Sequence, residues 1–143
     1  MYPIMVNLTN RPVTIVGGGK VAFRKYKKLI NDNPKLTVIS PEIDSRFDLD
    51  KINWVESRYK KSLIRDADLI LACTDDAEVN QAVYQDATAN QLVNNTSNKK
   101  NSDFYNVSTV EQDGFVYSIS SNGKDPFATK QKRRALEEWL RNN

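Results

Sequence analysis

The fold is decided by a glycine-rich stretch, Val13-Thr14-Ile15-Val16-Gly17-Gly18-Gly19-Lys20-Val21-Ala22-Phe23-Arg24-Lys25. A short β-branched run breaks into three glycines and then continues with helical spacing, so the stretch predicts a strand, a tight turn and a helix. The turn has the form G-x-G-x-x-A, which is typical of dinucleotide-binding folds. An ordinary strand-to-helix turn without a ligand is the alternative interpretation.

Each position of this turn has a physical reason. Gly17 allows a backbone turn that a Cβ would obstruct, and Gly19 lets the main chain approach a pyrophosphate. Ala22 is small enough for the helix to pack against the strand. The N–H groups and the positive dipole end of the helix would then face the phosphates. The candidate cofactor-binding residues of the turn are Gly17, Gly18, Gly19, Lys20 and Val21.

Length and composition exclude several classes of protein. At 143 residues the chain is one domain, or one domain with a small appendage, and has a real core. The net charge of +3 is too small to indicate a nucleic-acid binder, although it suits an anionic ligand. The single cysteine, Cys73, excludes an internal disulfide, and the absence of histidine removes the common zinc spacings, so we expect no metal site.

We expect neither a targeting segment nor a membrane span. No apolar run approaches the roughly 20 residues that span a bilayer, and the first residues lack the basic segment of a secretory signal. We therefore expect a cytoplasmic protein with no membrane partner.

Five short runs predict strands, over residues 13–16, 36–39, 52–55, 68–73 and 91–94. Apolar residues fall on one helical face over residues 20–31, and a second helix is expected after Asp75. Residues 59–67 are a polar connection or a single helical turn. Strands separated by helices or short connections indicate a parallel sheet with right-handed crossovers, which is an α/β, Rossmann-like fold.

Ligands of open parallel sheets bind at the carboxyl ends of the strands. Ser40, Pro41 and Glu42 follow the second strand, where the adenosine ribose arrives, and Glu42 either contacts the ribose or begins a solvated loop. NAD is favoured over NADP because no arginine lies in this turn. Thr74 and Asp75 follow the fourth strand, where they contact the cofactor or simply cap the next helix. Cys73, at the end of that strand, is expected in the core.

The pattern changes after residue 95. Residues 96–103 form a polar loop, and two alternating segments, 104–110 and 115–120, are joined by a glycine-containing turn that predicts a hairpin. Asp125 is a good N-cap, with Pro126 at the first position of a basic helix.

We therefore divide the chain into an NAD-binding Rossmann-like domain, residues 1–103, and a hairpin-plus-helix region, residues 104–143. A lone hairpin and one helix bury themselves poorly, so this region is expected to pack against the sheet or a second subunit.

Several motifs occur together in a specific order. They are Tyr2-Pro3, residues 16–25, Thr37-Val38-Ile39-Ser40-Pro41-Glu42, Ala72-Cys73-Thr74-Asp75-Asp76 with Asn80, and Ser118-Ile119-Ser120-Ser121-Asn122-Gly123-Lys124-Asp125-Pro126. On these motifs, nearly the whole chain resembles the dehydrogenase module of siroheme synthases, the precorrin-2 dehydrogenase family.

The resemblance implies oxidation of the tetrapyrrole precorrin-2 to sirohydrochlorin with NAD as hydride acceptor. It also implies a homodimer that shares the hairpin and the terminal helix, and substrate contacts at Ser121 and Lys124. In the alternative interpretation, the Ser121 hydroxyl only stabilises a turn. Basic residues gather where the resemblance places the substrate, and they either attract its carboxylates or form a solvated helix face: Lys99, Lys100, Lys124, Lys130, Lys132, Arg133 and Arg134.

The chain departs from the family pattern in two places. The family motif Asn-Val-Val-Asp ends in an aspartate assigned to catalysis, whereas this chain has Asn94-Asn95-Thr96-Ser97. Ser97 thus stands at the catalytic position, and a hydroxyl cannot accept a proton as a carboxylate can. Asp103, in the same loop, is the candidate substitute, and iron insertion is not expected. Family members also often continue with further helices, so the chain is expected to be a trimmed or short member.

Three functional hypotheses follow. The first is an NAD-dependent precorrin-2 dehydrogenase that works by alignment, with water or substrate carboxylates receiving the proton. The second is a non-catalytic module that binds a dinucleotide or tetrapyrrole and has lost the catalytic carboxylate. The third, a ligand-sensing domain of a transporter, does not explain the motif over residues 120–126.

Overall fold

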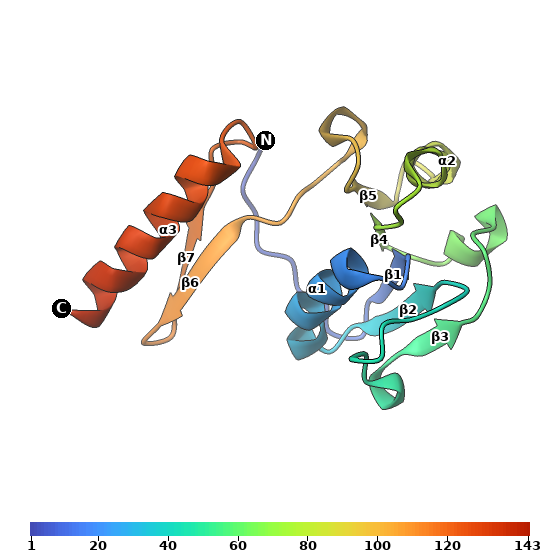
Figure 1. Ribbon diagram of the computed structural model, residues 1–143, viewed down its shortest axis with the longest axis horizontal. Helices are drawn as coiled ribbons and strands as arrows, with labels where there is room; N and C mark the ends of the chain where they lie inside the picture. The colour runs from blue at the N-terminus through green and yellow to red at the C-terminus, as the bar shows by residue number, and fades with distance from the viewer. The chain divides into compact units, whose positions relative to one another are not determined.

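The computed structural model describes all residues, 1–143. The chain divides into two compact units, residues 2–104 and residues 105–143 together with Met1. The larger unit contains a five-stranded sheet, and the smaller contains a hairpin and the longest helix (Figure 1).

All strands of the larger sheet run parallel, in the order β3-β2-β1-β4-β5. Their bounds are β1 (Pro12–Val16), β2 (Lys35–Ile39), β3 (Asn53–Val55), β4 (Leu69–Ala72) and β5 (Leu92–Asn95). The chain order reverses between β1 and β4, which is the topological switch point where such sheets bind ligands. The prediction of a Rossmann-like parallel sheet is confirmed.

Alternating residues of the strands supply two separate cores, one on each face of the sheet. On one face, Ile15 and Val38 pack with Tyr26 of helix α1 (Lys20–Leu29). On the other, Ile70 and Val93 pack with Val83 of helix α2 (Ala77–Asp86). Short 3-10 turns complete the connections: η1 (Ile30–Asp32), η2 (Leu49–Lys51), η3 (Lys61–Ile64) and η4 (Lys99–Asn101).

The cap of α2 differs from the prediction. Thr74 or Asp75 was expected to cap this helix, and that expectation is wrong: the Asp76 carboxylate accepts the backbone N–H groups of Glu78 and Val79, at 2.9 and 3.3 Å. The reason is that the helix begins at Ala77, so Asp76 is the residue directly before it, while the Thr74 hydroxyl bonds the Asp76 carbonyl and the Asn80 side chain.

The smaller unit begins with an antiparallel hairpin of β6 (Ser108–Gln112) and β7 (Phe115–Ile119). Its turn residues, Asp113 and Gly114, both have positive φ (52° and 79°), which matches the twist of the strands. The expectation that the first strand begins at residue 104 is wrong. The Phe104 carbonyl accepts a bond from the Asn94 side chain at 2.9 Å, so the chain there is tied to the larger sheet.

Helix α3 (Pro126–Arg141) starts as predicted, with Asp125 accepting the Ala128 N–H at 2.8 Å and Pro126 at the first position. It packs on the hairpin, where Val110 and Leu140 are buried. Some apolar residues of this unit are exposed to solvent. Phe115, Phe127 and Trp139 each expose 60–70% of their surface. No helix of the chain combines the length and the apolar character needed to cross a bilayer.

Candidate functional site

The glycine turn lies at the carboxyl edge of the sheet, between the ends of β2 and β4. The Gly17 N–H donates to the Ile39 carbonyl at 2.9 Å. With φ at +119°, a Cβ at Gly17 would lie 2.7 Å from the Cys73 carbonyl oxygen. Gly17 is therefore required for the backbone path at the switch point.

Gly18 and Gly19 meet different surroundings. A Cβ at Gly18 would collide with the Glu42 carbonyl oxygen and lie 2.5 Å from Ser40 Oγ. A Cβ at Gly19 would meet no atom within 4 Å. The backbone at Gly19 thus faces open space that a side chain would fill. Open space of this kind, which we call the cradle, is what the pyrophosphate of a dinucleotide needs for close approach; binding at Gly19 stays a prediction.

The start of α1 is electrostatically suited to an anion. Gly19 is its N-cap, no side chain caps the helix, and its first turn carries no acidic residue. Within the helix itself no side chain neutralises the positive end of the dipole, and such an N-terminus favours an anionic ligand. Lys20 and Val21, both exposed, begin this turn. These residues fit a dinucleotide.

A buried asparagine joins two of the predicted site residues. Asn80 is fully buried, and its Oδ1 accepts the backbone N–H and the hydroxyl of Thr74, at 3.0 and 2.8 Å. Its Nδ2 donates to the Thr74 carbonyl at 3.0 Å and to Ser97 Oγ at 2.6 Å. The ends of β4 and β5 are held together in this way. The sequence analysis did not give Asn80 this role, although a polar residue on the buried face of a helix is a signal for it.

Asp103, the second catalytic candidate, and Asp75, a cofactor candidate, make no hydrogen bond to Asn80. The Asp103 carboxylate accepts the Val93 N–H at 2.8 Å, and its own N–H donates to the Val93 carbonyl at 2.7 Å. Asp103 is therefore bound along β5. Asp75 is exposed beside the helix cap. Catalysis at Asp103 or Ser97 and cofactor binding at Asp75 stay predictions.

The segment after β2 folds against the glycine turn. Ser40 is buried, and its hydroxyl donates to the Glu42 carbonyl. Pro41 and the Glu42 side chain are exposed. Their contact with the cofactor stays a prediction.

The substrate candidates lie in the smaller unit. Ser121 Oγ accepts the Asp125 N–H at 2.9 Å and donates to the Asp125 carbonyl at 3.1 Å, so it stabilises the turn before α3. Lys124 is exposed in the same turn. Their role in binding substrate stays a prediction.

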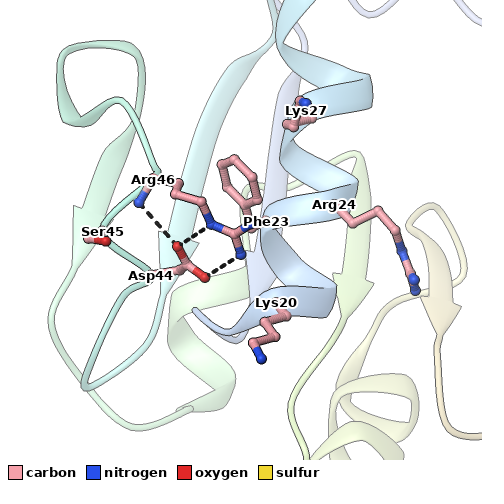
Figure 2. Close-up of a pocket in the computed structure, with 7 residues that line it drawn as sticks. All are labelled: Lys20, Phe23, Arg24, Lys27, Asp44, Ser45 and Arg46. Atoms are coloured by element: carbon pink, nitrogen blue, oxygen red, sulfur yellow. Dashed lines mark hydrogen bonds and ion pairs between the residues drawn. The ribbon is translucent and has the colours of Figure 1, made fainter.

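A cleft of about 940 Å³ opens beside α1 (Figure 2). It is lined by Lys20, Phe23, Arg24, Lys27, Asp44, Ser45 and Arg46. Arg46 Nε and Nη2 donate to the two Asp44 oxygens, at 2.8 and 2.7 Å. These hydrogen bonds lower the pKa of Asp44 to about 2. The Arg46 guanidinium also lies 4.3 Å from the centre of the Phe23 ring.

The sequence analysis missed Asp44 and Arg46. Glu42 is the first acidic residue after β2, whereas the structured connection continues through Phe47. The available signal was an acidic residue somewhat more than 20 positions beyond the glycines.

The sequence of the chain is similar to those of several known proteins. Residues 4–108 match the family described as "Putative NAD(P)-binding". The precorrin-2 dehydrogenase of Bacillus subtilis is 30% identical, over 98% of this chain and 89% of that protein. The chain belongs to the precorrin-2 dehydrogenase family. Siroheme synthase 2 of Aeromonas hydrophila subsp. hydrophila is 36% identical over 96% of this chain, which spans 30% of that relative.

A solved structure gives the same fold. The protein "SirC, precorrin-2 dehydrogenase" matches with a TM-score of 0.88 and 24% identity, over 96% of this chain and 70% of that chain. The predicted family resemblance is thus confirmed, as is the prediction of a nicotinamide dinucleotide as cofactor.

Cys73 is a core residue, as predicted. It is 4% exposed, and burial raises the pKa of its thiol to about 12. A buried thiol that stays protonated at neutral pH is a poor nucleophile, so Cys73 is suited to packing in the core of this precorrin-2 dehydrogenase family member.

Proposed function

We propose that this chain is an NAD⁺-dependent dehydrogenase that oxidises precorrin-2 to sirohydrochlorin in siroheme biosynthesis. One observation carries the proposal: the open cradle at Gly19 occurs in a chain that matches 89% of the length of a precorrin-2 dehydrogenase. We further propose that it acts in the cytoplasm.

In this proposal the chain itself binds and aligns the reactants. The backbone at Gly19 and the first turn of α1 hold the pyrophosphate, while the Gly17 turn holds the strand ends in place. Bound NAD⁺ supplies the hydride acceptor. Alignment of the nicotinamide with the macrocycle then provides most of the rate, and the proton leaves to water or to a substrate carboxylate.

We also propose a homodimer formed through the smaller unit. Its support is the apolar surface that the hairpin and α3 leave exposed at Phe115, Phe127 and Trp139. Sedimentation equilibrium of the purified chain tests this assembly.

The proposed reaction predicts coupled formation of two products. Under anaerobic conditions, the chain with precorrin-2 and NAD⁺ should form NADH and sirohydrochlorin in equal amounts, as followed by absorbance. Anaerobic conditions are needed because air oxidises the substrate without protein. NADH no higher than in the protein-free control would overturn the proposal.

A second candidate function is a binding module without catalysis. It is favoured by Ser97, a hydroxyl at the position where the family resemblance places a carboxylate. Binding of NAD⁺ and precorrin-2 without turnover would support this function instead.

Ser97→Asp separates the two functions. Because Asn80 Nδ2 already donates to Ser97 Oγ, a carboxylate at this position meets a donor and the variant should fold normally. If proton removal limits the rate, we expect kcat to rise by about tenfold or more, within the usual range of general acid–base effects. The measurement is anaerobic NADH formation at saturating NAD⁺.

The matched control is Ser102→Asp, which adds the same charge in the same loop. Its hydroxyl pairs with the backbone of Asn95 rather than with Asn80. Full turnover in the unaltered chain, unchanged by Ser97→Asp, would exclude the binding-module function.

A further inference from the structure

A half-buried lysine of α1 is hydrogen-bonded to the edge strand β5. Lys25 lies in the second turn of the helix, and its Nζ donates to Asn94 Oδ1 at 3.0 Å. Asn94 is 5% exposed, and the register of β5 places it next to Leu71 of β4. The interaction therefore joins the helix that follows the glycine turn to the far edge of the sheet.

The same asparagine closes the base of a loop. Asn94 Nδ2 donates to the Phe104 carbonyl at 2.9 Å, so the chain is bonded to itself on the two sides of residues 96–103, which we call the Ser97 loop. This loop contains Ser97, at the position where the family resemblance places a catalytic carboxylate. Asn94 thus contacts both α1 and the end of the loop.

The Ser97 loop is held by a side chain from the helix on each face of the sheet. From α2, Asn80 donates to Ser97 Oγ at 2.6 Å. From α1, Lys25 holds the base of the loop through Asn94. The two helices pack in separate cores, so these contacts fix the loop from opposite sides.

Lysine is a costly side chain at this position. Burial lowers the pKa of Lys25; the Cys73 thiol opposes this shift, and the cations Lys28 and Arg24 add to it. Cys73 and Phe104 belong to the apolar core on this face. An apolar side chain would therefore fill a half-buried position here at a lower cost in desolvation. What the lysine adds over an apolar side chain is the hydrogen bond to β5.

We propose that Lys25 is a positioning residue for the dehydrogenation: through Asn94 it fixes the Ser97 loop relative to α1. The inference rests on the proposed function, in which the first turn of α1 binds the pyrophosphate. The loop and the dinucleotide then share one helix as their reference, so the nicotinamide and the groups of the loop are held in one geometry. A displacement of about 1 Å in such a geometry can lower a rate by about 100-fold.

The test is a double-mutant cycle on turnover. For Lys25→Met we expect kcat for anaerobic NADH formation to fall by about tenfold, while the Kd of NAD⁺, measured by calorimetry, stays within about twofold. Asn94→Leu should lower kcat to a similar extent. Because Lys25 acts through Asn94, the double variant should be no slower than the slower of the single variants.

Trypsin cleavage after Lys99 and Lys100 reports on the same loop without substrate. Both lysines are exposed. Lys25→Met should raise the cleavage rate at these bonds by about tenfold, since loss of a hydrogen bond to a charged group shifts a local opening equilibrium by about that factor. If circular dichroism shows that this variant folds poorly, Lys25→Gln, which is one bond shorter, replaces it in both measurements.

The matched control is Lys28→Met, which removes a charge from an exposed position of the same helix. It should leave kcat and the cleavage rate unchanged. An unchanged kcat or cleavage rate in a folded Lys25 variant, or additive losses in the cycle, would overturn the inference while the dehydrogenase function stands. A chain that forms no NADH would overturn both.

Discussion

Gly19→Val is expected to raise the Kd of NAD⁺ by about 100-fold while the protein remains folded. A valine side chain would fill the open space at Gly19 and keep the pyrophosphate away from the first N–H groups of α1. Loss of two hydrogen bonds to a charged group accounts for about that factor. Because the Cβ meets no atom within 4 Å and φ is −85°, the substitution should lower the free energy of unfolding by no more than about 1 kcal/mol.

Calorimetric titration with NAD⁺ and thermal unfolding of the same sample check both parts. The matched control is Asn53→Val, a neutral exposed residue at the start of β3, where an added valine should change neither quantity much. Substitutions at Gly17 or Gly18 could not separate an effect on NAD⁺ binding from an effect on stability, since a Cβ at either would collide with backbone atoms and disturb the fold. A Kd for Gly19→Val within threefold of the original would show that the cradle does not hold the dinucleotide.

The sheet could be predicted from sequence because its signals are local. Each strand is a short apolar run bounded by turn residues. No observed end of these five strands differs from the predicted end by more than one residue. The local geometry at two glycines could also be predicted, since the G-x-G-x-x-A form distinguishes a turn position at Gly17 from an open position at Gly19. Both conformations are present in the structure.

Contacts between distant segments could not be predicted in the same way. Residue 104 follows an alternating pattern, yet its carbonyl is bound by Asn94 and the strand begins later, at Ser108. The placement of Asp44 against Gly18 likewise depends on how a loop returns to the sheet edge. Local periodicity contains no information on such pairings, which depend on tertiary structure.

In the candidate site, too, the local signals could be predicted and the contacts between distant segments could not. The sequence indicated Thr74 and Ser97 separately, one after each of two neighbouring strands. It did not indicate that a third residue from α2 connects them. Asn80 is the fourth residue of α2, where the pattern alone favours an apolar side chain. Only its full burial with four side-chain hydrogen bonds identifies its role.

Asn80→Ala should therefore be strongly destabilising. The substitution leaves the backbone N–H and carbonyl of Thr74 without their partners at the end of β4. Loss of several buried hydrogen bonds should lower the free energy of unfolding by about 3 kcal/mol. The measurement is urea unfolding followed by tryptophan fluorescence in a Trp139→Phe background, so that Trp54 alone reports on the larger unit.

The control for this loss is Asn101→Ala. That side chain is only partly buried and makes one hydrogen bond, to Gln81 at 2.6 Å, so its removal should cost about 1 kcal/mol or less. The double variant Asn80→Ala/Ser97→Ala then tests whether Asn80 acts through Ser97. If the two side chains are coupled, the combined loss should fall short of the sum of the single losses by about 0.5 kcal/mol or more. Additive losses would mean that Asn80 stabilises the end of β4 but does not position Ser97.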